Sequence, residues 1–258
     1  MIQNPVRWLD EMLGILEKIK VTQADSIEKA SQICFRAISS DGVVHLFGCG
    51  HSRIPVEEMF PRYGSYPGFH PIVELSTSFH SQVVGANGQR QAMFIEEVSG
   101  LAEAIIKNFR IKPNDAAMVF SASGVTLVTV EFAQQCKEIG VPVIGVLSLA
   151  QAEAMQNIES VRRISEYADV VIDLCTPCGD AACYVSGYDT PVGPTTTAAA
   201  VAIVNCIKVR TAELLAQASK LPPVITSAAL VGKQRSAALF DAAYAEYGRR
   251  YGDRIRKE

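Results

Sequence analysis

The amino-acid sequence predicts an α/β protein in which five parallel strands form a sheet between layers of helices. Short apolar runs alternate with segments of helical periodicity over residues 43–174, a pattern typical of parallel strands joined by crossover helices. Two of these runs, at 43–46 and 116–120, end in loops rich in serine and glycine. Because ligands of open parallel sheets bind beyond the carboxyl ends of the strands, both loops are expected at one site.

A helical segment precedes the first strand. Residues 5–40 predict two helices, and Val6, Leu9, Leu13 and Leu16 of the first are spaced three and four residues apart on one face. That apolar face has to pack on the rest of the domain or on a partner chain. We therefore expect a homodimer or a higher homo-oligomer in which this segment makes a contact.

The five strands and the helices between them follow in order. We expect the strands at 43–48, 71–75, 116–121, 141–147 and 169–174. The connecting helices are expected at 54–61, 96–109, 126–139 and 151–167. Each connection should be a right-handed crossover.

The last third of the chain begins with a polar stretch rich in glycine and proline, at 176–194. It predicts no regular secondary structure, and segments of this length without any often serve a function. A long helix from 195 to about 218 and a helical tail at 231–258 follow. We thus predict a single domain over 1–258, with its core at about 35–230, an N-terminal helical extension at 1–40 and the C-terminal tail.

Composition narrows the classes of partner. The chain has 258 residues and a formal net charge of −3, which provides no long-range field for nucleic acid or an anionic membrane. No apolar stretch reaches the roughly 20 residues that span a bilayer, so we expect a cytoplasmic protein with no membrane or nucleic-acid partner. The seven cysteines predict reduced thiols. Cys175 and Cys178 form a C-x-x-C pair, but no second ligand pair accompanies it, and no metal is expected.

The two loops contain the groups that bind a phosphate. The first turn of a helix offers backbone N–H groups without intrahelical partners at the positive end of the helix dipole. Hydroxyls that could donate further hydrogen bonds come from Ser52, Ser121, Ser123 and Thr126. Glycines such as Gly50 and Gly124 let the backbone approach the ligand. Together the loops predict one phosphate-binding site.

The sequence SASGVT at 121–126 resembles the S-x-S-G-x-T phosphate loop of the SIS (sugar isomerase) domain family. Residues 35–230 look like one such domain, and the whole chain resembles stand-alone phosphosugar isomerases of that family. The resemblance implies a three-layer αβα fold of the flavodoxin-like kind with a five-stranded parallel sheet. It also implies that Ser52, Ser121, Ser123 and Thr126 hold the phosphate of a phosphorylated sugar.

Aldose–ketose isomerisation needs a base for the proton beside the carbonyl and a group that moves protons between the two oxygens. Glu58, six residues after Ser52, is our predicted base, since Glu57-Glu58-Met59 resembles a Glu-Glu-Leu pattern of phosphoheptose isomerases. His51 could polarise the carbonyl or assist ring opening. The alternatives are a solvated helix face for the two glutamates and a structural loop histidine.

Three further residues are candidates for ligand contact. Arg53 and Arg62 could pair with the phosphate or with a sugar carboxylate through a planar fork. Asp180 follows the last predicted strand and could bind sugar hydroxyls or form a turn.

Other functions compete with isomerisation. NAD binding is disfavoured because Arg53 stands where the third glycine of G-x-G-x-x-G should follow Gly48 and Gly50, and no cofactor is expected. An etherase or lyase acting on an amino-sugar phosphate, and a sugar-phosphate sensor without catalytic activity, stay open.

Overall fold

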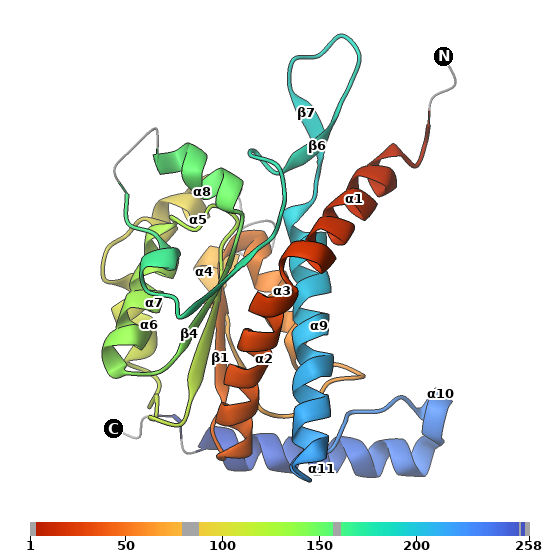
Figure 1. The fold of residues 1–258 in the computed structure, drawn as a ribbon. Helices are drawn as coiled ribbons and strands as arrows, with labels where there is room; N and C mark the ends of the chain where they lie inside the picture. The colour runs from red at the N-terminus through yellow and green to blue at the C-terminus, as the bar shows by residue number, and fades with distance from the viewer. Residues whose placement is uncertain (1–3, 79–87, 157–160, 253, 256–258) are drawn as a thin grey trace.

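The computed structural model describes residues 4–78, 88–156, 161–252 and 254–255. Its main sheet is parallel throughout and has the strand order β2-β1-β3-β4-β5. The strands are β1 (Val44–Gly48), β2 (Phe69–Ile72), β3 (Ala116–Phe120), β4 (Val143–Leu147) and β5 (Val170–Asp173). Helices cover both faces of this sheet (Figure 1), so the predicted α/β fold class with a five-stranded parallel sheet is confirmed.

The strands are apolar along their whole length because helices bury both of their sides. In β3, Met118 and Phe120 belong to a core cluster shared with the helices α2 (Ala24–Ser39) and α9 (Thr196–Gln217). The intervening Val119 belongs to a second cluster shared with α6 (Leu101–Ile106) and α7 (Leu127–Ile139). The alternation of side chains along one strand thus feeds two cores.

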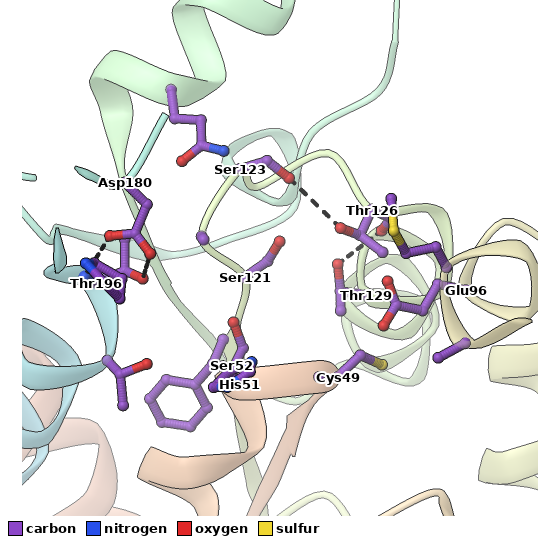
Figure 2. Close-up of a pocket in the computed structure, with 18 of the residues that line it drawn as sticks. Cys49, His51, Ser52, Glu96, Ser121, Ser123, Thr126, Thr129, Asp180 and Thr196 are labelled. Carbon is purple, nitrogen blue, oxygen red and sulfur yellow. Dashed lines mark hydrogen bonds between the residues drawn. The ribbon is translucent and has the colours of Figure 1, made fainter. Parts of the chain in front are cut away.

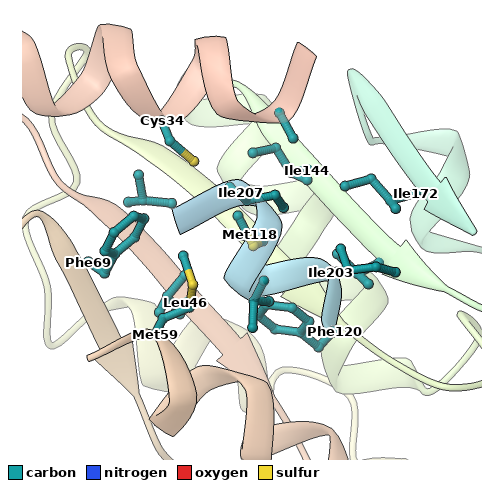
Figure 3. Packing of buried hydrophobic residues seen from close by; sticks show 14 of the residues in the cluster. Cys34, Leu46, Met59, Phe69, Met118, Phe120, Ile144, Ile172, Ile203 and Ile207 are labelled. Carbon is teal, nitrogen blue, oxygen red and sulfur yellow. The ribbon is translucent and has the colours of Figure 1, made fainter. Parts of the chain in front are cut away.

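The first cluster is the larger of the two. It packs Leu46, Phe69, Met118 and Ile144 of the sheet against Ile203 and Ile207 of α9 and against Cys34 of α2 (Figure 3). Burying one such large apolar side chain completely stabilises the folded state by about 1.5–3 kcal/mol. Because α2 supplies Cys34 and the buried Ile38, this part of the predicted N-terminal extension is a core helix.

Two predicted helices have different bounds in the structure. The helix expected at 96–109 is replaced by α5 (Gly88–Glu96) and α6, separated by a turn in which Gly100 has φ +84°. That left-handed conformation suits glycine and breaks the helix. The helix expected at 151–167 is α8 (Leu149–Gln156), followed after the undescribed residues 157–160 by the short 3-10 helix η3 (Ile164–Glu166).

The polar stretch expected to lack regular structure contains an antiparallel hairpin, β6 (Ala181–Tyr184) and β7 (Pro191–Pro194). Proline and glycine have a low propensity for strands, so the sequence of this stretch does not favour a hairpin. The hairpin is stabilised instead by its packing on α1 (Arg7–Thr22). Trp8 packs against Gly193 and donates from Nε1 to the carbonyl of Pro194 at 3.2 Å. The hairpin and α1 project together from one end of the domain (Figure 1).

The remaining elements are short, apart from the last helix. They are α3 (Ile54–Met59), α4 (Leu75–Ser78), α10 (Ala228–Val231), α11 (Lys233–Gly252) and the 3-10 helix η1 (Gly50–Arg53). The tail predicted at 231–258 corresponds to α11, and α10 precedes it; residues 253 and 256–258 lie outside the described part. In the described part of the chain, no helix combines the length and the apolar character that crossing a membrane requires.

A buried polar cluster fastens the C-terminal tail to the sheet. Asp115 accepts hydrogen bonds from the backbone N–H of Val43 and from the guanidinium of Arg254, and it lies 3.2 Å from His45 Nε2. His45 in turn lies 2.9 Å from His70, Nδ1 to Nδ1. Burial, followed by the neighbouring His45, lowers the pKa of His70 to about 3, so this ring is neutral near pH 7.

Candidate functional site

The two predicted loops line one cavity of about 420 Å³. β1 and β3 are adjacent, with Gly48 opposite Phe120, so the loops leave the sheet side by side. Figure 2 shows Ser52 and His51 from the first loop facing Ser121 from the second, with Glu96 toward one end of the cavity and Asp180 toward the other. The two loops thus lie side by side on one cavity, as their place at the same edge of the sheet predicts.

The first loop depends on glycine to turn tightly after β1. A Cβ on Gly48 would lie 2.4 Å from the carbonyl oxygen of Ser52, so a larger residue has no room. Gly50 has φ +53° and begins η1. The backbone N–H of Ser52 donates to the carbonyl of Cys49 at 2.9 Å. This turn brings Ser52 and His51 to the cavity wall.

The second loop is ordered by its own hydroxyls. Ser121 Oγ accepts from the N–H of Gly124 at 3.1 Å, and Ser123 Oγ accepts from the N–H of Val125 at 3.3 Å. Ser123 Oγ also lies 3.5 Å from Thr126 Oγ1. Each hydroxyl keeps hydrogen-bonding capacity toward the cavity, because a hydroxyl both donates and accepts.

The helix α7 begins at this loop without a side-chain cap. Thr126 is its N-cap residue, and the side chain of Thr126 makes no capping hydrogen bond. Gly124, at φ +70°, packs directly on Leu147 and turns the chain into the helix. The cavity therefore combines the positive end of a 13-residue helix with the three hydroxyls of the second loop and that of Ser52, an arrangement suited to an anion.

Glu96 supplies a carboxylate that the sequence analysis did not predict in the site. It ends α5, lines the cavity and is half-buried. Its Oε1 atom would lie 3.8 Å from a Cβ built on Gly50, so the carboxylate lies over the first loop. Burial, and secondarily the like charge of Glu97, raises the pKa of Glu96 to about 7. Within the described ranges its carboxylate has no hydrogen-bond or ion-pair partner.

Comparison with known proteins identifies the family. Residues 7–148, more than half of the chain, match the SIS domain. The chain belongs to the SIS domain family. This confirms the resemblance seen in the phosphate loop.

Relatives of similar length are known from several bacteria. A UPF0309 protein of Listeria monocytogenes serotype 4b is 31% identical over 228 residues, covering 88% of this chain and 89% of its own. A UPF0309 protein of Geobacillus kaustophilus is 31% identical over 218 residues, covering 84% of each chain. The phosphoheptose isomerase of Neisseria gonorrhoeae superposes with a TM-score of 0.51 at 11% identity, over 79% of this chain and 94% of that one. At that identity the superposition shows a shared fold.

Glu58, the predicted base, does not line the cavity formed by the two loops. It faces α9, where its carboxylate accepts a hydrogen bond from Asn205 Nδ2 at 3.0 Å and lies 3.9 Å from Lys208 Nζ. The same carboxylate pairs with Arg62, which follows α3. Burial raises its pKa, but hydrogen bonds from Asn205 and Arg62 outweigh burial and leave the pKa below its ordinary value. With these partners the group is a poor proton acceptor near neutral pH. It lines a separate cavity of about 490 Å³ beside α11.

Neither of the two predicted arginines is among the described residues that line this cavity. Arg62 lines the second cavity with Glu58, and Arg53 donates to the carbonyl of Ser78 and pairs with Glu57 at 2.6 Å. Among the described residues that line the phosphate cavity, none is a lysine or an arginine. An anion held in this cavity would therefore have hydroxyls, backbone N–H groups and the helix dipole as its partners.

Asp180 lines the cavity but is engaged by the start of α9. Its Oδ1 accepts from the N–H groups of Thr195 and Thr196 at 2.8 and 2.6 Å, and its Oδ2 accepts from Thr196 Oγ1 at 2.6 Å. It thus caps the helix from a separate segment, a role that the predicted contact with sugar hydroxyls did not include. Its backbone is left-handed, with φ +58°.

The signal for Glu96 in the sequence was weak. Expecting one helix from residue 96 made this glutamate a first-turn acid, which commonly stabilises a helix without any other role. The true helix ends there, and Glu96 lies four residues after the buried Ala92, on the inward face of α5. To place Glu96 correctly, the sequence analysis would have had to recognise that Gly100 separates two helices, the first of which ends at Glu96.

Proposed function

We propose that this SIS domain binds a phosphorylated sugar and interconverts its aldose and ketose forms without a cofactor. The observation that carries the proposal is a half-buried carboxylate with a pKa near 7, Glu96, beside a hydroxyl-rich loop at a helix N-terminus. An enzyme of this kind needs both an anchor for the phosphate and a base whose pKa lies near the working pH.

The anchor proposed here consists of Ser52, Ser121, Ser123 and Thr126 with the uncapped first turn of α7. Dianionic phosphate would accept hydrogen bonds from the hydroxyls and from the N–H groups of that turn. These hydrogen bonds would fix the phosphate end of the sugar and thereby orient its carbon chain in the cavity. The phosphate is common to every substrate of this class, so the anchor determines the ligand class and leaves the sugar open.

The proton transfer is assigned to Glu96 in place of Glu58. As a carboxylate, Glu96 would take the proton from the carbon beside the carbonyl, giving an enediol, and return it to the neighbouring carbon. The proton shared by the two oxygens has to move at the same time, and His51 on the cavity wall is the proposed partner for it. No electrons or groups are exchanged with another molecule, so no cofactor is required.

The test measures binding and turnover on the same panel of ligands. Aldose and ketose phosphates of four to seven carbons, amino-sugar phosphates and their dephosphorylated forms are screened by thermal shift, since a ligand that binds only the folded state stabilises it. Ser123→Ala should weaken binding of a phosphorylated sugar about 10- to 100-fold through loss of a charge-assisted hydrogen bond. Ser40→Ala, at an exposed serine after α2, is the matched control.

Each outcome of that screen has a defined meaning. Stabilisation by a phosphosugar, lost without the phosphate and in Ser123→Ala, supports the anchor, and appearance of the isomeric sugar phosphate supports the reaction. Binding without turnover replaces isomerisation by a sensor function, and release of an ether substituent from an amino-sugar phosphate replaces it by lyase chemistry. Absence of any phosphate-dependent shift overturns the proposal.

We also propose that a second copy of the chain covers the exposed face of α1. Leu9 and Leu13 are 52% and 63% exposed on this helix, and Tyr188 at the tip of the hairpin is 72% exposed. The first half of α1 carries Arg7, Asp10 and Glu11, a net charge of −1, and the second half carries Glu17, Lys18 and Lys20, a net charge of +1. Two copies packed antiparallel would therefore place opposite charges together and bury both apolar stripes.

Light scattering should give the wild-type protein a molar mass in solution above the 27.9 kDa of one chain. The Leu13→Arg variant should have the mass of a monomer. Burying an arginine at the centre of an apolar contact leaves its charge without a partner, which dissociates the pair. Leu230→Arg, at a residue 80% exposed on α10, should leave the mass unchanged. A wild-type monomer, or an unchanged mass for Leu13→Arg, contradicts this assignment of the surface.

A further inference from the structure

The side chain of Gln151 contributes to the cavity of the two loops an amide whose oxygen has no hydrogen-bond donor among the described residues. Gln151 lies in the first turn of α8 and lines the cavity. Its Oε1 atom is buried and accepts no hydrogen bond from any residue that the structure describes. Buried acceptors in folded proteins are nearly always paired, so one without a donor on a cavity wall points to a donor on the ligand.

The backbone holds Gln151 in register with the phosphate loop. The N–H of Ser148 donates to the carbonyl of Ala122 at 3.0 Å, inside the second loop. Ser148 Oγ donates to the carbonyl of Thr176 at 3.1 Å, and the N–H of Gln151 approaches Ser148 Oγ at 3.4 Å. The next residue, Ala152, is buried and fixes the turn. The distance from the phosphate loop to the amide is therefore set by the fold.

The chemistry of the buried atom distinguishes the two parts of the ligand. An amide oxygen only accepts hydrogen bonds, and the oxygens of a dianionic phosphate also only accept. Oε1 therefore has no favourable contact with the phosphate. A sugar hydroxyl, an amine or an amide N–H can all donate to it. With the amide in this orientation, the partner of Oε1 is a donor on the sugar part of the molecule.

We propose that Gln151 recognises a hydroxyl or N–H group on the sugar and thereby selects phosphosugars over inorganic phosphate and over analogues that lack this donor. The proposal rests on the proposed sugar-phosphate function and adds the residue that reads the sugar. It makes Gln151 a specificity residue, separate from the phosphate anchor and from Glu96. The selected class is a sugar phosphate with an intact donor at the position facing α8.

The experiment compares binding of inorganic phosphate, of the phosphosugar that stabilises the wild type most, and of its monodeoxy analogues. The variant is Gln151→Met, which keeps the length of the side chain and removes both hydrogen-bonding groups. The affinity of the phosphosugar should fall about 10- to 100-fold, while that of inorganic phosphate changes less than about twofold. One deoxy analogue should bind the wild type and the variant alike. Gln156→Met, at an exposed glutamine on the same helix, is the control.

The outcomes separate this proposal from the proposed function. Retained binding of inorganic phosphate shows that the variant is folded and its anchor intact. If Gln151→Met keeps the wild-type preference for the phosphosugar, or loses inorganic phosphate to the same degree, the role of Gln151 is wrong while the sugar-phosphate function stands. If the wild type binds no phosphosugar better than inorganic phosphate, both proposals fall.

Discussion

Replacing Glu96 with glutamine is expected to lower kcat for sugar-phosphate isomerisation by about 100-fold or more. Glutamine keeps the size of the side chain but cannot accept a proton, and general-base catalysis typically contributes about 10²–10⁴-fold to the rate. Binding of the phosphosugar should persist, because Glu96 is not part of the proposed phosphate anchor. Steady-state kinetics and equilibrium binding on one preparation measure the two effects separately.

The pH dependence provides a second readout. Because burial raises the pKa of Glu96 to about 7, kcat/KM should rise with pH through that value as the carboxylate forms, and fall about tenfold per pH unit below it. Glu97→Gln removes the neighbouring like charge that also raises this pKa. The Glu97→Gln variant should have a lower half-maximal pH and the same plateau rate. If Glu96 had only a structural role, this substitution would not shift the pH profile.

Glu58→Gln decides between the two candidate bases. Its carboxylate is held by Asn205 and Arg62 in the second cavity, so its loss should affect stability more than kcat. A Glu96→Gln enzyme with more than about a tenth of wild-type turnover contradicts the assignment of the base. If Glu58→Gln abolished turnover instead, the original prediction from the sequence would be correct.

The sheet was predictable because the information for it is local. Continuous apolar runs such as 116–120 arise when both sides of a strand are buried, and the structure supplies those two cores through Met118 and Val119. The two loops were predictable for the same reason, since a glycine- and hydroxyl-rich turn follows each run directly in the sequence.

The partners of the catalytic candidates were not predictable, because they come from distant parts of the chain. The surroundings of Glu58 depend on Asn205 and Lys208, which lie 147 and 150 residues further along. Glu96 was missed since its position depends on where α5 ends. Gln151 has an ordinary helical sequence around it, and only the cavity indicates a role. Residue type and spacing thus predict an anchor for phosphate, whereas the tertiary contacts decide which carboxylate is the better candidate for the proposed base.

A second large effect is expected at the opposite end of the sheet, where Asp115→Asn should destabilise the domain by about 3–5 kcal/mol. The side chain of Asp115 is 0% exposed. It accepts from the N–H groups of Val43 and Lys112 and from Arg254, all at 2.8–2.9 Å. Asparagine would turn an NH₂ group toward donors and leave Arg254, which is itself buried, without a counter-charge. Urea unfolding at pH 7.5 measures the difference in the free energy of unfolding.

Asp169 offers a matched control within the same sheet, because it makes the same kind of contact in a wetter place. It accepts from the N–H of Val143 at 2.9 Å and pairs with Lys137, as Asp115 does with Val43 and Arg254, but its side chain is 36% exposed. Water can replace the lost partner there, so Asp169→Asn should cost about 1 kcal/mol or less. If the two variants lose equal stability, burial is not what makes the Asp115 cluster important. If Asp115→Asn alone is severely destabilised, the desolvated ion pair fastens the C-terminal tail to the strands that carry the phosphate loops.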